Sequence, residues 1–534
     1  MLARTLLVGL DGATFTVLDP LMAEGVMPAL REFVRRGARA ELLSTPNPLT
    51  PPAWTSLVTG RTPGHHGIFD FVRSSENGGG LYFTLNTSFD VRCETIWSVV
   101  GRLGGSVTSL NFPVTAPPRP VNGSIVPGFV PWRHLRRSVH PRELYDHLKS
   151  IPGFDARELA MDMNEELKSI QWLPEEQYEE WITHHIRRER QWFGIARSLL
   201  ATRPADLVAV LFDGVDKLQH LFWRYLDPDL ATTLRTPREG RVRDMCLEYF
   251  RRLDGVLAEL LAATGPETRV FFASDHGFGP TTSVFYANVW LERQGWLAWA
   301  DGTPKDDWGN FAADRIKSHV VGIDWSRTRA YALTPSSNGI FIRRAAHAGA
   351  PGVEPERYEA FRRELAGRLL ELTDPGSGRR VVRRVMTREE AFPGAASEGA
   401  PDLTLVLDDY GFLSVLNADT VVRARPEAAG THRPQGIFLA GGPGIEAGRS
   451  LGPLSIVDVA PTLLHSLGLP VPADWEGRVP VECFDGAFRA AHPVLAGGPS
   501  VPPEGGAAAP AGERMSDEDE EKVLERLKAL GYVE

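Results

Sequence analysis

Residues 270–280 read VFFASDHGFGP, an apolar run that stops abruptly at Ser-Asp-His-Gly. Residues 269–273 are predicted to form a strand buried on both faces, because successive apolar residues are typical of a covered parallel sheet. Asp275 and His276 then follow at the carboxyl end of this strand, the edge where open α/β sheets bind ligands. A carboxylate beside an imidazole is a natural pair of ligands for a divalent metal. The same pattern also fits an acid that caps a turn with a histidine beside it.

The layout of a buried strand followed by an acid occurs twice more. Residues 5–10 form an apolar strand that ends at Asp11, and residues 206–212 lead into the segment DGVDKLQH. If residues 215–225 are helical, Asp216 and His220 are four positions apart and project from one helix face, as one divalent ion requires. Asp213 lies seven positions from His220 and is therefore assigned a supporting role.

Thr50 opens a further informative stretch, TPPAWTSLVTG. We expect Thr50 at the N-cap of a helix over residues 53–58, with its hydroxyl at the positive end of the helix dipole, where phosphate binds well. A simple capping threonine fits the same pattern. Further along the chain, His432 is predicted on a Gly-Thr-His-Arg-Pro turn that precedes a strand at 437–440.

Composition excludes several classes of protein. With 43% hydrophobic and 24% charged residues the chain is an ordinary globular protein, and no stretch approaches the roughly 20 apolar residues of a membrane span. The net charge of -10 argues against nucleic acid as a partner. Three widely spaced cysteines suggest no disulfide framework. The first apolar run is too short for a signal peptide, so we expect a cytoplasmic protein.

Strand patterns alternate with helical patterns at 17–37, 95–103, 175–200 and 239–263, which predicts an α/β fold with a mostly parallel sheet and helices on both faces. His184 and His185 lie among charged neighbours in the third of these helices, which predicts a solvated face. Four segments are expected: a compact catalytic domain at 1–485, a cap-like elaboration within it at about 281–400, an Ala/Pro/Gly linker at 486–515 and a terminal helix at 516–534. Five tryptophans crowd the start of the elaboration, namely Trp290, Trp296, Trp299, Trp308 and Trp325. Residues 112–137 are expected to be a long ordered loop.

Acids at strand ends, three histidines near them and a hydroxyl at a helix start together form two sets of potential ligands. Two divalent ions roughly 4 Å apart with mixed aspartate and histidine ligands are a standard apparatus for displacement at phosphorus. This residue mix favours zinc, with manganese as the alternative.

Five segments resemble, in their order, the alkaline phosphatase superfamily and its type I phosphodiesterase/nucleotide pyrophosphatase branch: LVGLDG, TPPAWTSLVTGRTPGHHGIFDF, DKLQH, SDHGFG and GTHRP. The resemblance implies that one metal is held by Asp216, His220 and His432, and the other by Asp11, Asp275 and His276. It also implies that Thr50 binds the second metal as the nucleophile. The implied reaction is cleavage of a small phosphodiester or nucleotide-like pyrophosphate through a phosphothreonine intermediate.

One departure concerns the substrate. The chain has Ala53 where nucleotide pyrophosphatases carry an asparagine that holds a phosphate oxygen. The Cys/Ser-x-Pro-x-Arg motif of sulfatases is missing around Thr50, but a phosphomonoesterase or a phosphomutase would use the same seven residues. A non-catalytic binding protein on this scaffold is the alternative from another class. The sequence decides neither the physiological substrate nor the oligomeric state.

Overall fold

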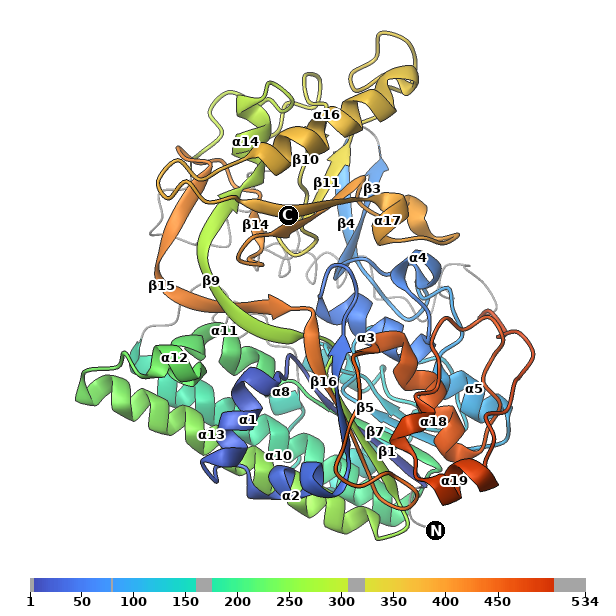
Figure 1. Cartoon of the computed structure of the whole chain (residues 1–534). Coiled ribbons are helices and arrows are strands. Elements are labelled where there is room, and N and C mark those ends of the chain that lie inside the picture. The colour runs from blue at the N-terminus through green and yellow to red at the C-terminus, as the bar shows by residue number, and fades with distance from the viewer. Residues whose placement is uncertain (1–3, 78–79, 160–174, 306–321, 504–534) are drawn as a thin grey trace. The chain divides into compact units, whose positions relative to one another are not determined.

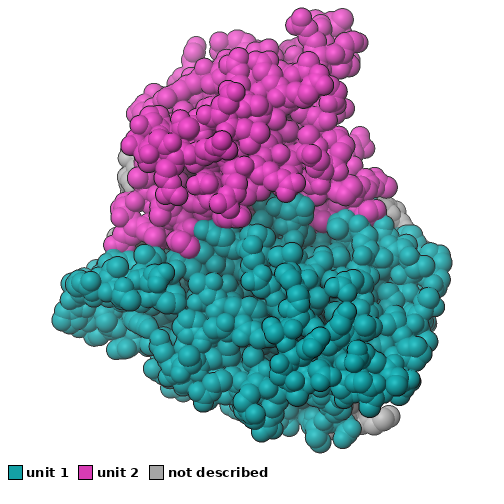
Figure 2. Space-filling model, viewed as in Figure 1, with its two compact units in different colours: residues 1–62, 87–279, 432–509 teal, residues 63–86, 280–431, 510–534 magenta. Residues whose placement is uncertain are grey.

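The computed structural model describes residues 4–77, 80–159, 175–305 and 322–503. The chain divides into two compact units, shown in separate colours in Figure 2. Unit 1 comprises residues 1–62, 87–279 and 432–509, and unit 2 comprises residues 63–86, 280–431 and 510–534. The terminal helix expected at 516–534 and Trp308 lie outside the described residues.

Unit 1 is built on a nine-stranded sheet with the strand order β17-β2-β16-β8-β1-β7-β5-β6, in which β18 also pairs with β2. The central pairs β8–β1, β1–β7, β7–β5 and β5–β6 are parallel, and β16 runs antiparallel to β8 and β2. The predicted α/β class with a mostly parallel sheet is thus confirmed. The strands are β1 (Thr5–Leu10), β2 (Ala38–Leu43), β5 (Val107–Leu110), β6 (Gly123–Val126), β7 (Leu207–Phe212), β8 (Arg269–Ala273), β16 (Gln435–Gly441), β17 (Arg449–Ser450) and β18 (Leu454–Ser455).

Helices cover both faces of this sheet because successive apolar residues of each central strand point to opposite sides (Figure 1). In β1, Leu6 and Val8 pack into one buried cluster, whereas Leu7 packs into the other. The first face carries α1 (Phe15–Ala23), α2 (Pro28–Arg36), α10 (Tyr178–Thr202), α11 (Gly214–Leu226) and α13 (Pro237–Thr264). The second carries α3 (Thr50–Thr59), α5 (Ile96–Arg102), α18 (Val459–Leu467) and α19 (Gly486–Ala491).

Shorter helices of unit 1 connect these elements. They are α6 (Trp132–Leu135), α7 (Leu144–Ser150), α8 (Ala156–Leu159), η1 (Glu175–Gln177), α12 (Pro228–Ala231), η4 (Ile456–Asp458) and η5 (Val481–Cys483). Two of the sequence expectations are wrong here. Residues 112–137 are not one loop, because they contain β6 and α6, and the first residues of the expected linker form α19.

The helix predicted over residues 17–37 is in fact two helices, α1 and α2. The chain turns between them because Gly25 adopts a left-handed conformation (φ 77°) and Pro28 starts the second helix. His185 was expected on a solvated face, yet it is buried in α10 and its ring lies 4.1 Å from that of Trp181. Charged neighbours in sequence misled that prediction, because only every third or fourth residue of a helix shares a face.

Unit 2 contains a four-stranded sheet, β10-β11-β13-β12, a three-stranded sheet, β14-β9-β15, and the hairpin β3-β4. Trp290 and Trp296 are buried in it and pack edge to face, so they are ordinary core residues. The strands are β3 (Val72–Asn77), β4 (Gly80–Leu85), β9 (Gly277–Tyr286), β10 (Ala330–Tyr331), β11 (Gly339–Ile342), β12 (Val382–Thr387), β13 (Leu403–Leu407), β14 (Leu413–Ser414) and β15 (Val422–Arg433). The helices are α4 (Pro63–His66), α14 (Ala287–Arg293), η2 (Pro355–Arg357), α16 (Tyr358–Glu371), α17 (Arg388–Ala391) and η3 (Ser397–Gly399).

No helix of the described residues combines the length and the apolar character that crossing a membrane requires.

The topology of the large sheet places two of the predicted site acids, Asp11 and Asp275, at the same sheet edge. Asp11 follows β1 directly, and Asp275 follows β8 after one residue. Because β1 and β8 are parallel, both acids lie at the same edge. The antiparallel strand β16 begins at this edge instead of ending there, which is why His432, at the end of β15, precedes β16 while the acids follow β1 and β8.

Candidate metal centre

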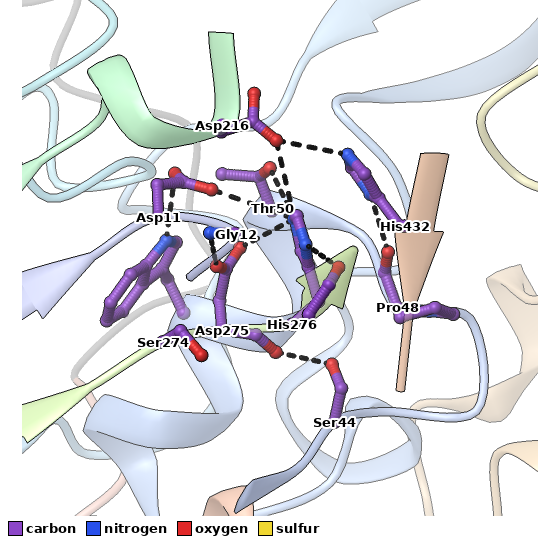
Figure 3. Close-up of polar contacts among 12 residues, drawn as sticks. Asp11, Gly12, Ser44, Pro48, Thr50, Asp216, Ser274, Asp275, His276 and His432 are labelled. Carbon is purple, nitrogen blue, oxygen red and sulfur yellow. Dashed lines mark hydrogen bonds and ion pairs between the residues drawn. The ribbon is translucent and has the colours of Figure 1, made fainter. Parts of the chain in front are cut away.

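The structure brings the seven predicted site residues together within unit 1, and all of them except His220 are labelled in Figure 3. Six of them form two compact groups, within each of which the potential ligand atoms lie within 4.8 Å of one another. The helix group comprises Asp216 and His220 of α11 together with His432 of β15, and the strand group comprises Asp11, Asp275 and His276, which follow β1 and β8. Thr50 lies beside the strand group.

Distances within the helix group match those between ligands of one ion. His432 Nε2 lies 3.2 Å from Asp216 Oδ1 and 3.1 Å from His220 Nε2, and His220 Nε2 lies 3.5 Å from Asp216 Oδ1. Ligands at 2.0–2.1 Å from a tetrahedral zinc are about 3.3 Å apart. The three atoms could therefore bind a single divalent cation.

The strand group has the same spacing. His276 Nε2 lies 3.2 Å from Asp275 Oδ2 and 3.6 Å from Asp11 Oδ1. It also lies 4.0 Å from Asp216 Oδ1, and the rings of His276 and His432 stack with centroids 3.6 Å apart. The two groups are thus neighbours, as two ions acting on one phosphate would require.

Each acid of these groups has one buried oxygen for which the described residues provide no hydrogen-bond donor: Asp11 Oδ1, Asp216 Oδ1 and Asp275 Oδ2. These three oxygens are the ones that face the histidines. In two of the acids the other oxygen is held by the protein, since Asp275 Oδ1 accepts from the Gly12 amide at 3.1 Å and Asp11 Oδ2 accepts from the indole of Trp54. Buried carboxylate oxygens without donors are costly, and a bound cation would compensate them. The residues fit two divalent ions.

Backbone carbonyls fix the ring orientation of two of the histidines through their Nδ1 atoms. His432 Nδ1 lies 2.8 Å from the Pro48 carbonyl, and His276 Nδ1 lies 3.1 Å from the Gly277 carbonyl. A nitrogen that faces a carbonyl carries the proton and donates it, so Nε2 keeps its lone pair for a metal. Ser44 completes this support by donating to the Asp275 carbonyl at 2.5 Å.

Burial and mutual repulsion govern the titration of the centre. Burial, then the charges of Asp275 and Asp216, raise the pKa of Asp11 well above its usual range. Burial also raises the pKa of Asp275, to about 8, and lowers that of His276 well below its ordinary value. Burial opposes ionisation of Asp216 as well, but His220 and Lys217 outweigh it and lower its pKa. The carboxylates of Asp11, Asp216 and Asp275 therefore repel one another when ionised, and a bound cation would offset this repulsion.

Thr50 differs from the expectation in its helix position. The helix α3 begins at Thr50 itself, Leu49 takes the N-cap position, and neither side chain caps a backbone amide. The next two residues are prolines, which need no cap because they lack an amide hydrogen. The Thr50 hydroxyl is buried and lies 3.5 Å from His276 Nε2. It therefore faces the candidate centre and does not act as a simple capping residue.

His432 lies on a strand and not on the predicted turn. β15 continues through the Gly-Thr-His-Arg segment to Arg433, and only Pro434 separates it from β16. The glycines after His276 also serve packing, because a Cβ at Gly277 would lie 1.9 Å from the Gln435 carbonyl and one at Gly279 would lie 2.6 Å from the side chain of Arg433. Because β9 approaches β15 and β16 so closely at these glycines, His432 lies beside the acids of the centre.

Arg61, which the sequence places near Thr50, does not serve the centre. Its guanidinium pairs with Asp474 at 2.6 Å and with Glu476 at 3.4 Å. This pairing fixes the loop after α3. Trp54, in contrast, contacts the candidate ligand Asp11. Both residues are close to Thr50 in sequence, so the sequence does not indicate which of them lies at the centre.

A buried polar network supports the first turn of α11, which carries Asp216. Glu189 of α10 accepts from the Gly214 amide at 2.8 Å and from the Tyr249 hydroxyl at 2.9 Å. A Cβ at Gly214 would lie only 2.4 Å from that hydroxyl, so the close approach requires glycine. Beside it, Asp213 accepts two hydrogen bonds from Arg188, each 3.0 Å long. Asp213 thus has a structural partner in the described residues.

Glu189 predicts a pH dependence of stability. Burial and the charge of Asp213 raise its pKa from 4.5 to about 8, so the folded protein keeps this proton to a higher pH than the unfolded chain. Stability is then lost as the pH rises from about 4.5 to about 8, by a few kcal/mol in order of magnitude. We expect Glu189→Gln to flatten the fall in Tm between pH 5 and 8, measured by circular dichroism on metal-free protein.

The matched control is Glu259→Gln, which alters an exposed acid paired with Arg190. Its Tm profile is expected to follow that of the wild type. If Glu189→Gln also follows the wild-type profile, Glu189 does not titrate in this range.

Comparison with known families yields a match that covers most of the chain. Residues 5–435 match the family described as type I phosphodiesterase / nucleotide pyrophosphatase. A segment of 89 residues is 37% identical to the 2,3-bisphosphoglycerate-independent phosphoglycerate mutase of Dinoroseobacter shibae, but it spans only 16% of this chain and 16% of that protein.

Solved structures of similar fold include human ectonucleotide pyrophosphatase/phosphodiesterase 5, with a TM-score of 0.51 and 15% identity over 90% of this chain and 100% of that chain. Another is phosphonoacetate hydrolase from Sinorhizobium meliloti in complex with phosphonoacetate, with a TM-score of 0.49 and 16% identity over 87% of this chain and 95% of that chain. At such identities the structural similarity concerns the fold. Since the family match extends from β1 to the start of β16, this chain belongs to the type I phosphodiesterase/nucleotide pyrophosphatase family of hydrolytic enzymes.

Proposed function

We propose that this protein hydrolyses a small phosphodiester or pyrophosphate substrate at a two-metal centre, with Thr50 as the nucleophile. The observation that carries the proposal is the proximity of the helix and strand groups, in which three buried carboxylate oxygens without a hydrogen-bond donor among the described residues face the imidazoles, with the Thr50 hydroxyl beside them. Family membership supports the same reaction class.

In the proposed reaction Thr50 Oγ1 gives its proton to water and attacks phosphorus, and the departing oxygen takes up a proton from water. A bond forms between Oγ1 and phosphorus, and the bond from phosphorus to the leaving oxygen breaks. Water then attacks the phosphothreonine, the bond between phosphorus and Oγ1 breaks, and a proton released by that water is taken up by Thr50 Oγ1. The chain's contribution is a buried threonine fixed at the first residue of α3, in a site whose low exposure strengthens electrostatic interactions.

Divalent cations held by the two groups would lower the pKa of the threonine hydroxyl and neutralise charge on the attacking and leaving oxygens. Asp216, His220 and His432 would hold one ion, and Asp11, Asp275 and His276 the other. Mixed carboxylate and imidazole ligands support zinc, with manganese as the alternative.

Removal of metal tests the centre directly. We expect protein purified without added metal to contain about two divalent ions per chain, and chelation by EDTA to reduce hydrolysis at least about 100-fold, with recovery on addition of Zn²⁺ or Mn²⁺. Metal content is measured by plasma emission spectroscopy. Activity that survives complete removal of metal would contradict the proposal.

Substrate profiling tests the substrate class. We expect turnover of bis-p-nitrophenyl phosphate well above that of p-nitrophenyl phosphate, because the proposal assigns the enzyme to diesters. The reverse order would assign it to phosphomonoesters. Ala53, which lacks the amide of the asparagine in nucleotide pyrophosphatases, makes this measurement decisive for the substrate and leaves the reaction class unaffected.

Phosphoryl transfer to a hydroxyl instead of water is the second candidate function, favoured by the short similarity to a phosphoglycerate mutase. A mutase would form no inorganic phosphate from a phosphorylated sugar acid and would return the phosphoryl group to a second hydroxyl. Release of inorganic phosphate in stoichiometric amount with product excludes it.

A further inference from the structure

Trp54 connects the candidate nucleophile to a candidate metal ligand. It follows Thr50 by four residues on α3, so both side chains project from one face of the helix. Its indole Nε1 donates to Asp11 Oδ2 at 3.2 Å. Trp54 and Asp11 are both 1% exposed, so water does not compete for this hydrogen bond.

Packing fixes the indole in the orientation that makes this bond. The ring meets Phe112 edge to face, with centroids 5.4 Å apart. The ring also lies close to Gly9 of β1, where an added Cβ would come within 2.8 Å of it. The lack of a side chain at Gly9 therefore lets the indole reach the acid that ends the same strand.

Because of this hydrogen bond, the two carboxylate oxygens of Asp11 have different surroundings. Oδ2 is held by the indole, and Oδ1, which has no hydrogen-bond partner, lies 3.6 Å from His276 Nε2 within the strand group. Asp275 shows the same division, with Oδ1 held by the Gly12 amide and Oδ2 turned to His276. An oxygen already engaged by a donor is a weaker ligand, so each acid presents one oxygen to the ion.

We propose that Trp54 is a positioning residue that limits Asp11 to a single ligand oxygen and so sets the coordination number of the metal in the strand group. This inference rests on the proposed two-metal function. It assigns a role to the indole N–H itself, beyond the apolar packing of the ring.

A pair of matched variants separates the N–H from the packing. Trp97 is also buried and also meets Phe112 edge to face at 5.4 Å, but its Nε1 has no hydrogen-bond partner in the part of the chain that the structure describes. Trp54→Phe and Trp97→Phe therefore remove equal ring surface from one aromatic cluster, and only the first removes a contact to the centre.

Binding of Zn²⁺ to metal-free protein is measured by competition with a chromophoric chelator. We expect Trp54→Phe to weaken one of the two sites about 10–100-fold and Trp97→Phe to leave both unchanged. Co²⁺ supplies a signature that loss of packing alone would not give. With Oδ2 released, Asp11 binds through two oxygens, and the visible absorption of one Co²⁺ site falls towards that of a higher coordination number in Trp54→Phe only.

If Trp54→Phe does not fold, benzothienylalanine at position 54 keeps the bicyclic shape and removes only the N–H, and the same measurements apply. Equal Zn²⁺ affinity and equal Co²⁺ spectra in the wild type and the Trp54 variant overturn the inference while the two-metal function stands. A wild-type protein that binds fewer than two ions overturns the proposed function, and this inference with it.

Discussion

Replacing Thr50 with alanine is expected to reduce hydrolysis at least about 10³-fold, because the variant lacks the oxygen that attacks phosphorus. The metal content should stay at the wild-type level, since the six acid and imidazole groups remain in place. The hydroxyl is buried at the first residue of α3, so the substitution removes no capping bond and should change stability little. Steady-state kinetics with bis-p-nitrophenyl phosphate and metal analysis of the same preparations provide the measurement.

The control for this variant is Thr55→Ala. Thr55 is buried in the same helix, but its hydroxyl donates to the Pro51 carbonyl and does not face the centre. Hydrolysis by Thr55→Ala is expected to stay near the wild-type rate. Thr50→Ser, which keeps a hydroxyl, should recover part of the activity lost in Thr50→Ala. If Thr50→Ala hydrolyses the diester as fast as Thr55→Ala, Thr50 is not the nucleophile.

Arg188→Met is expected to destabilise the protein by about 3–5 kcal/mol, the largest stability effect of the variants considered. Arg188 and Asp213 are both almost completely buried, and the guanidinium donates to both carboxylate oxygens. Burial opposes ionisation of Asp213, but Arg188 lowers its pKa below the ordinary value. Without the arginine the protein must bury an unpaired carboxylate or protonate it. Urea-induced unfolding of metal-free protein measures the loss.

Two further variants serve as controls for the stability loss expected of Arg188→Met. Arg190→Met changes the next arginine of α10, whose ion pair with Glu259 is exposed, and should cost no more than about 1 kcal/mol. The double variant Arg188→Met with Asp213→Leu removes both buried charges and should recover much of the stability. If Arg188→Met is as stable as Arg190→Met, the buried pair does not stabilise the fold.

Much of the candidate centre could be predicted from the sequence because its acids follow buried strands. Val270 to Ala273 and the run before Asp11 are apolar enough to identify parallel strands, and parallel strands end at one edge. The spacing of Asp216 and His220 likewise required only a helix. These features depend on neighbours within a few residues, where sequence patterns are informative.

Other features depended on contacts that no local pattern reports. His185 lies among charged residues in sequence yet is buried against Trp181. The helix position of Thr50 differed by one residue, because two prolines removed the amides that a cap would have served. His432 was expected on a turn, whereas pairing of β15 within its sheet extends the strand through it.

The sequence by itself determined which chemical groups this protein possesses and at which strand and helix ends they occur, since those follow from the apolar pattern and from residue type. Only the tertiary structure decided which oxygen of each acid is free. Asp11 is 43 positions from the indole that holds it, and Asp275 is 263 positions from the amide of Gly12. Such orientations arise from packing between distant segments, where a glycine such as Gly9 matters for the atoms it lacks.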